Sequence, residues 1–148
     1  MKVIDVPLDL EMHKNQVLIE ESGARFKAIE AGKRFGKTMW AIKSLIKKAG
    51  MGVRKLYWYI APTYGQAKDI AWRNGILKIL PRVCIEDYWE SDLRVKLKGG
   101  GSEIVLKGAE NPDTLRGSGV DGYVLDEFDY MDDWIWPSIL SGQLNDGG

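Results

Sequence analysis

The 148-residue sequence contains a single cysteine, Cys84, and a single histidine, His13. One cysteine excludes an internal disulfide framework and a multi-cysteine zinc site, and one histidine argues against a His-rich metal centre or a Ser-His-Asp triad. No run of about 18 apolar residues is present, so no membrane-spanning segment is expected. Asp5, Asp9 and Glu11 interrupt the apolar N-terminal stretch, so no signal peptide is expected either. We therefore expect a soluble, cytoplasmic protein without membrane association.

The sequence also lacks net charge, because 21 Lys and Arg residues balance 21 Asp and Glu residues. This balance argues against a stand-alone, strongly cationic nucleic-acid-binding protein. The charges are nevertheless segregated along the chain. Residues 24–55 contain ten basic residues and one acidic residue, whereas residues 109–133 contain eight acidic residues and one basic residue. Either these segments form two solvated faces of opposite sign, or the fold unites them around a bound anion and a bound cation.

The length and composition, 45% hydrophobic and 28% charged, are those of one globular domain. Apolar and alternating runs predict strands at 25–31, 56–61 and 123–125, and a β-hairpin at 93–98 and 103–107. Helices are predicted at 14–22, 37–48, 66–80 and 134–144. Because strands alternate with helices, we expect an α/β protein with a mainly parallel sheet flanked by helices and an antiparallel β-hairpin insertion.

The strongest motif lies between the first predicted strand and the helix that follows it. Residues 31–38 form a variant of the phosphate-loop pattern G-x-x-x-x-G-K-[ST], in which Ala31 occupies the first glycine position. In such a loop Gly36 lets the backbone approach a phosphate, Lys37 reaches the β- and γ-phosphates, and Thr38 ligates Mg²⁺. The alternative is a cationic turn without a ligand. The predicted nucleotide-binding residues are Gly32, Lys33, Arg34, Phe35, Gly36, Lys37 and Thr38.

A second motif at residues 123–127 is a short buried strand that ends in two acids, Asp126 and Glu127. Asp126 is predicted to bind the magnesium ion opposite Thr38, and Glu127 to orient and deprotonate the water that attacks the γ-phosphate. The alternative is an acidic turn that caps the next helix. Together with the phosphate loop, the pair predicts a Mg²⁺-dependent ATP hydrolase with Lys37 and Glu127 as catalytic residues.

These residues resemble the N-terminal packaging ATPase of the large terminase subunits of tailed double-stranded DNA phages, a P-loop NTPase of the ASCE, RecA-like type. The resemblance runs in order through six segments between about residues 16 and 148. They are Ala24–Lys27, Ala31–Thr38, Ile60–Lys68, Leu106–Asp113, Leu115–Gly117 and Val124–Glu127. As a set they are more specific than the phosphate loop and the acidic pair, which many helicases and ATPases share.

The resemblance implies ATP-driven translocation of double-stranded DNA into a procapsid, with ATP and Mg²⁺ as cofactors. The implied partners are double-stranded DNA, the portal protein, the small terminase subunit and further copies of the chain in a homo-oligomeric ring, pentameric by resemblance. The implied location is the host cytoplasm, at the procapsid portal. Complete family members continue with a coupling segment and a nuclease domain, so we expect a chain truncated at Gly148 that does not cut DNA. The expected organisation is an adenine-side surface segment at 1–24 and an incomplete ATPase domain at 25–148.

The resemblance also assigns roles to residues around the phosphate loop. Gln16 stands where similar ATPases place a glutamine that reads the adenine amino group; the alternative is a surface glutamine. Family members often carry Arg at the position of Lys33, in a charge-stabilising role. Lysine keeps the charge but loses the bidentate fork, and Arg34 could take over the role.

Arg116 is the only base of the acidic segment, and it lies in a stretch rich in turn formers, residues 111–119, that is expected to be an exposed loop. By resemblance it is a catalytic arginine finger that inserts into the site of a neighbouring subunit. The alternative is a local ion pair with Asp113 or Asp121.

Two other functions stay open at this point: a helicase-like DNA-dependent ATPase, and a non-catalytic nucleotide-binding or assembly fragment. A second ATPase-like domain in a longer chain would indicate a helicase, and a nuclease domain would indicate a terminase. ATP turnover, measured with and without DNA, separates the non-catalytic fragment from both.

Overall fold

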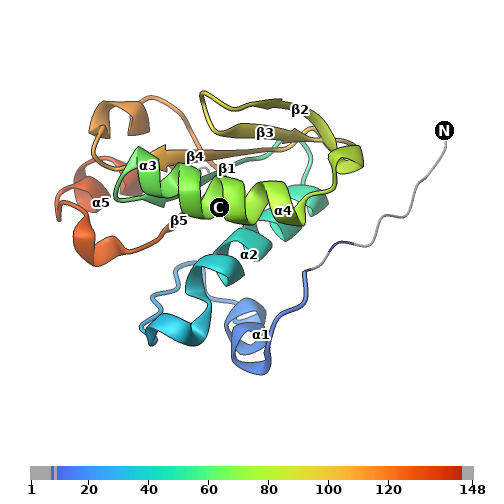
Figure 1. Cartoon of the computed structure of the whole chain (residues 1–148). Coiled ribbons are helices and arrows are strands. Elements are labelled where there is room, and N and C mark those ends of the chain that lie inside the picture. Colours follow the sequence, from blue (N-terminus) through green and yellow to red (C-terminus); the bar gives the residue numbers. More distant parts are fainter. Residues whose placement is uncertain (1–7, 9, 145–148) are drawn as a thin grey trace.

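The structure, a computed structural model, describes residue 8 and residues 10–144 (Figure 1). These residues form a mixed sheet in the order β2-β3-β4-β1-β5. The strands are β1 (Leu56–Ala61), β2 (Ile85–Trp89), β3 (Arg94–Leu97), β4 (Glu103–Gly108) and β5 (Gly122–Leu125). The helices are α1 (Lys14–Glu21), α2 (Lys37–Met51), α3 (Tyr64–Gln66), α4 (Leu77–Ile79) and α5 (Ile135–Ser138), with a π-helix at Ala67–Ile76 between α3 and α4. Residues 1–7, 9 and 145–148, with Asp5, Asp9 and the outer ends of the predicted segments 1–24 and 25–148, lie outside the described residues.

The centre of the sheet is parallel, because β1 pairs in parallel with both β4 and β5. Strand β3 is antiparallel to both of its neighbours, β2 and β4. The predicted α/β class with a mainly parallel core is therefore confirmed. The predicted hairpin is present as β3 and β4, but β4 lies inside the sheet beside β1 and is not a peripheral insertion.

Strand β1 is buried on both faces, as its continuous apolar run predicts. Tyr59 and Ala61 face a core that includes α2 and the span from α3 to α4. Trp58 and Ile60 face a second core, which the segments after β4 and β5 cover. Figure 1 shows the helical span from α3 to α4 lying in front of the sheet, roughly along the direction of its strands, with α1 at the end of the molecule away from β2 and β3.

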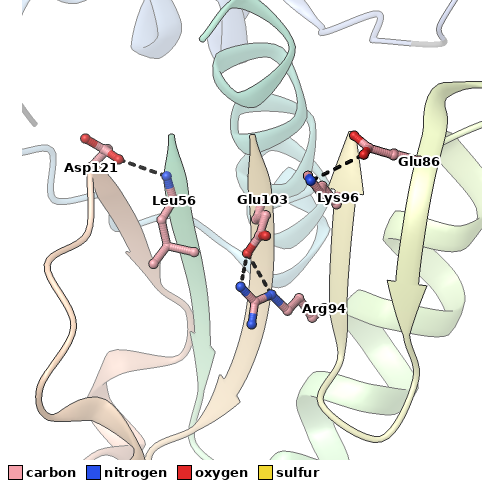
Figure 2. Close-up of polar contacts among 6 residues, drawn as sticks. All are labelled: Leu56, Glu86, Arg94, Lys96, Glu103 and Asp121. Atoms are coloured by element: carbon pink, nitrogen blue, oxygen red, sulfur yellow. Dashed lines mark hydrogen bonds and ion pairs between the residues drawn. The ribbon is translucent and has the colours of Figure 1, made fainter. Parts of the chain in front are cut away.

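Charged side chains join neighbouring strands at the edge of the sheet where β1 and β4 begin (Figure 2). The Leu56 amide donates to Asp121 Oδ2 at 2.8 Å, which fixes the start of β1 beside the start of β5. Arg94 and Glu103 form an ion pair between β3 and β4, and Lys96 lies 3.3 Å from Glu86 of β2. Such partly exposed pairs each stabilise the fold weakly, and they join side chains that the strand pairing already brings together.

The predicted strand at 25–31 is wrong, because none of its residues pairs with a strand of the sheet. The segment is held by side chains instead: Lys27 Nζ donates to the Ile19 and Glu20 carbonyls, and Phe26 meets the ring of Trp136 edge-on at 5.8 Å. Alternation tells which side chains face inward, but it does not tell whether a backbone partner lies alongside.

The helix predicted at 66–80 is present, but its central ten residues form a π-helix. Gly75 lies so close to α2 that a Cβ there would overlap Ile42 Cδ1, so the glycine permits close packing. The helix predicted at 134–144 is reduced to α5 and a 3-10 turn, Leu140–Gly142. Strand β2 had no predicted counterpart. Among the described residues, no helix combines the length and apolarity needed to cross a bilayer.

Gly108, the last residue of β4, provides a test of the packing beneath the loops that follow β1 and β4. A Cβ at Gly108 would overlap the Tyr64 amide nitrogen and lie 2.7 Å from the carbonyl carbon of Thr63. Because both are backbone atoms, we expect Gly108→Ala to lower the free energy of unfolding by about 1–3 kcal/mol. The control Gly50→Ala, in α2 with open space around the new Cβ, should raise it by about 0.5–1 kcal/mol. Urea unfolding measures both, and equal stabilities would contradict the close packing.

Candidate functional site

The phosphate-loop motif forms a tight turn that leads directly into α2. Residues Lys33–Phe35 make one 3-10 turn, in which the Phe35 amide donates to the Gly32 carbonyl at 3.0 Å. Gly36 has φ +78°, a left-handed conformation that favours glycine and reverses the chain into the helix. The first helical bond runs from the Trp40 amide to the Gly36 carbonyl. The amides of Lys37 and Thr38 precede it and therefore face outward, where they can receive an anion.

Lys37 crosses the base of the loop, where its ammonium donates to the carbonyl of Ala31. This contact closes the loop and holds the positive charge next to the outward-facing amides. Lys33 and Arg34 lie exposed on the 3-10 turn, and Phe35 is half-buried. The predicted binding residues are thus gathered on one turn and the first turn of α2.

Gln16 of α1 is hydrogen-bonded to the backbone of this loop. Its side chain is buried, and Nε2 donates to the Gly36 carbonyl at 3.1 Å and to the Phe35 carbonyl at 3.3 Å. Oε1 accepts from the His13 amide at 3.2 Å, so both ends of the Gln16 amide have partners. The alternative of a surface glutamine is therefore wrong, and reading of adenine stays a prediction. His13 was not predicted to contribute, yet its Nε2 lies 2.9 Å from the Phe35 carbonyl.

Asp126 directly follows β5 and brings the acidic segment to the basic one. Its amide donates to the Ile60 carbonyl at 2.9 Å, which continues the pairing of β5 with β1. The carboxylate is buried, and its Oδ2 accepts from Thr38 Oγ1 at 2.5 Å. Its Oδ1 accepts from the Glu127 amide at 3.1 Å. Of the two interpretations of the charge pattern, the structure favours the one that unites the segments.

Tyr59 of β1 is a residue of this site that the sequence did not predict. Its hydroxyl donates to Asp126 Oδ2, the oxygen that also accepts from Thr38. Burial and the negative charge of Asp126 raise the pKa of this hydroxyl, so it stays protonated and remains a donor. One signal in the sequence was a tyrosine inside a strand buried on both faces, since a buried tyrosine hydroxyl usually has a partner.

The oxygen atoms at this point fit a magnesium ion. Thr38 Oγ1 and Asp126 Oδ2 are hard ligands that converge from the start of α2 and the end of β5. Within residues 8 and 10–144, no group of three or more His, Cys, Asp or Glu side chains could hold a metal ion alone. Mg²⁺ needs only one or two protein oxygens when phosphate oxygens and water supply the rest.

Glu127 occupies a left-handed backbone conformation, with φ 54° and ψ 44°, which is unfavourable for a residue with a Cβ. It precedes a 3-10 turn, Phe128–Tyr130, but its side chain makes no capping hydrogen bond there. The capping alternative is therefore not supported for Glu127. Glu127 is exposed and follows directly after Asp126.

Arg116 lies in an exposed loop, as predicted, but among the described residues it makes no hydrogen bond or ion pair with the phosphate loop. Its Nε lies 3.6 Å from Asp113 Oδ1, so the local ion pair is present. The loop itself is anchored, because Leu115 is buried and its carbonyl accepts from Gln143 Nε2. An exposed pair of this kind contributes little and leaves the guanidinium available to another molecule.

Solved structures of phage large terminases are similar to this chain. The Thermus phage P74-26 large terminase ATPase domain has a TM-score of 0.78 and 26% sequence identity, over 90% of this chain and 60% of that chain. The large terminase from a second, thermophilic bacteriophage has a TM-score of 0.65 and 16% identity, over 96% of this chain and 37% of that chain. The same thermophilic phage protein in complex with ATP-gamma-S has a TM-score of 0.59 and 16% identity, over 88% of this chain and 36% of that chain.

The chain therefore has the fold of phage large terminase ATPase domains, and the resemblance read from its motifs is confirmed. It spans about 60% of the P74-26 domain. A scan of protein-family models and a search of curated proteins gave no match.

The left-handed conformation of Glu127 predicts an effect on stability. Glu127→Gly removes the Cβ that makes this conformation costly, whereas Glu127→Ala keeps it. We expect the glycine variant to be more stable than the alanine variant by about 1 kcal/mol, although both lose the carboxylate. Thermal and urea unfolding measure the difference. A more stable alanine variant would show that residue 127 is not left-handed in solution.

Proposed function

We propose that this chain is the ATP-binding and ATP-hydrolysing part of a viral DNA-packaging terminase large subunit. The observation that carries the proposal is the contact between Thr38 and Asp126, which unites the phosphate loop with the acidic strand end. The likeness of the fold to the P74-26 ATPase domain over 90% of the chain supports it. In this proposal, hydrolysis drives double-stranded DNA into a procapsid.

In this proposal the residues of the site have separate roles in ATP hydrolysis. The amides at the start of α2 and the Lys37 ammonium bind the β- and γ-phosphates. Thr38 Oγ1 and the Asp126 carboxylate hold Mg²⁺, which neutralises phosphate charge when it is bound. The Glu127 carboxylate orients a water molecule toward the γ-phosphate and accepts its proton.

The residues around the loop set its shape and charge. Gln16 links α1 to the Phe35 and Gly36 carbonyls, and in this proposal the same side chain lies next to the adenine ring. Lys33 and Arg34 project from the turn and add positive charge near the phosphates. Of the two, Arg34 offers the bidentate fork that suits phosphate oxygens.

The proposed assembly is a homo-oligomeric ring at the procapsid portal in the host cytoplasm. Its partners are double-stranded DNA, the portal protein and the small terminase subunit. Arg116 acts across the subunit boundary, because its loop is exposed and its own phosphate loop is out of contact. Structures of the thermophilic phage terminase with ATP-gamma-S and with ADP support nucleotide binding by proteins of this fold.

Substitutions of Lys37 and Glu127 test the nucleotide site with two separate readouts. Lys37→Ala should weaken Mg²⁺-ATP binding about tenfold or more and abolish hydrolysis, because it removes a charge from the phosphates. Glu127→Gln should keep ATP bound but unhydrolysed, because the amide retains the shape and loses the basicity. Calorimetry and phosphate release measure both, with the exposed Lys78→Ala as the control. Normal binding by Lys37→Ala would overturn the assignment of the phosphate loop.

Arg116→Ala should leave ATP binding nearly intact and reduce hydrolysis in an assembled ring by on the order of 10³-fold. Mixed rings of Arg116→Ala and Glu127→Gln subunits should regain activity, because one intact Glu127 site then receives an intact Arg116. Arg73→Ala is the matched control, since Arg73 is also exposed and pairs with a nearby acid, Asp69. Mixed rings that assemble but stay inactive would show that Arg116 does not act across subunits.

A further inference from the structure

Three hydrogen-bond donors converge on the Asp126 carboxylate, one from β1, one from α2 and one from the turn that follows β5. The Tyr59 hydroxyl of β1 and the Thr38 hydroxyl of α2 both donate to Oδ2, and the Glu127 amide donates to Oδ1. Two of these residues already have roles in the proposed function. Tyr59 has none, although it is 2% exposed and lies in β1, between β4 and β5.

We propose that Tyr59 is a positioning residue for the divalent cation of this site, holding the Asp126 carboxylate in the orientation that binds Mg²⁺. The inference rests on the proposed function, because it assigns the cation to Thr38 and Asp126. Tyr59 acts through Asp126 and does not itself bind the metal or the nucleotide.

The geometry separates Tyr59 from Thr38. A threonine hydroxyl that ligates a cation uses an oxygen lone pair and can still donate its hydrogen to Asp126, so Thr38 would contact both the metal and the carboxylate, whereas Tyr59 contacts only the carboxylate. Tyr59 is fixed in β1, which pairs with β5 through Tyr59 and Val124. The Tyr59 hydroxyl and the Glu127 amide therefore hold the two oxygens of Asp126 independently of Thr38. Substitution of a group that orients a metal ligand in this way typically lowers the metal affinity by about 10- to 100-fold.

Tyr123 of β5 supplies a matched control. Its hydroxyl donates to the Leu140 carbonyl at 3.0 Å, on the opposite face of the sheet, and burial raises its pKa to about 12. Tyr123→Phe and Tyr59→Phe each remove one tyrosine hydroxyl that donates a hydrogen bond, from β5 and from its neighbour β1 respectively. Only Tyr59→Phe removes a donor from Asp126.

The experiment measures the dissociation constant of ATP for the 148-residue chain twice, once in excess Mg²⁺ and once in EDTA. For Tyr59→Phe we expect affinity in EDTA within about twofold of the wild type and affinity in Mg²⁺ lower by about tenfold. Tyr123→Phe should change neither value. Electron paramagnetic resonance with Mn²⁺ and ATP gives a second readout, in which Tyr59→Phe should bind less Mn²⁺ at equal nucleotide occupancy.

Each other result overturns the inference. An equal loss of affinity in both conditions would show that Tyr59 only supports the loop, and unchanged Mg²⁺ dependence would show that Asp126 needs no such donor. If the wild-type chain binds no ATP, the proposed function fails as well, which distinguishes the two failures. Should Tyr59→Phe not fold, Tyr59→Leu removes the same hydroxyl donor, and ATP affinity in Mg²⁺ equal to that of the wild type would then overturn the inference.

Discussion

The contact between the Thr38 hydroxyl and the Asp126 carboxylate joins two residues that lie 88 positions apart. It requires β5 to lie beside β1 in one register and α2 to begin at Lys37. The register is fixed at both ends of the strand pair: Asp121 bonds the Leu56 amide where the strands begin, and the Asp126 amide bonds the Ile60 carbonyl where they end. The sheet therefore acts mainly to bring an acidic strand end to the start of a helix.

The two turns that form the site both contain a left-handed residue. Gly36 adopts this conformation without cost, whereas Glu127 adopts it with a Cβ present. Strain of this kind persists where surrounding structure determines the backbone, and it is common at functional sites. Here the determining contacts are the amide of Glu127 on Asp126 and the side chain of Gln16 beneath the loop. The stability lost at residue 127 is consistent with a carboxylate placed for chemistry.

Local patterns in the sequence predicted the parts of the fold that depend on local physics. The apolar run of β1 and the loop-to-helix transition at Gly36 were predicted from residue types alone, and so was the acidic end of β5. The segment 25–31 was predicted as a strand and is not one, because pairing depends on a neighbour that alternation does not encode. The contact of Tyr59 with Asp126 was not predicted, and neither were the hydrogen bonds from Gln16 to the loop, because the partners of both residues are distant in sequence. The adenine role of Gln16 and the trans role of Arg116 remain predictions.

The most direct test of the site is a crystal structure of the chain grown with Mg²⁺ and a non-hydrolysable ATP analogue. We predict phosphate oxygens on the amides of Lys37 and Thr38, with the metal ion between Thr38 Oγ1 and the Asp126 carboxylate. The Lys37 ammonium should leave the Ala31 carbonyl for the phosphates. Nucleotide bound elsewhere, or a metal ion without contact to Asp126, would contradict the assignment of this site.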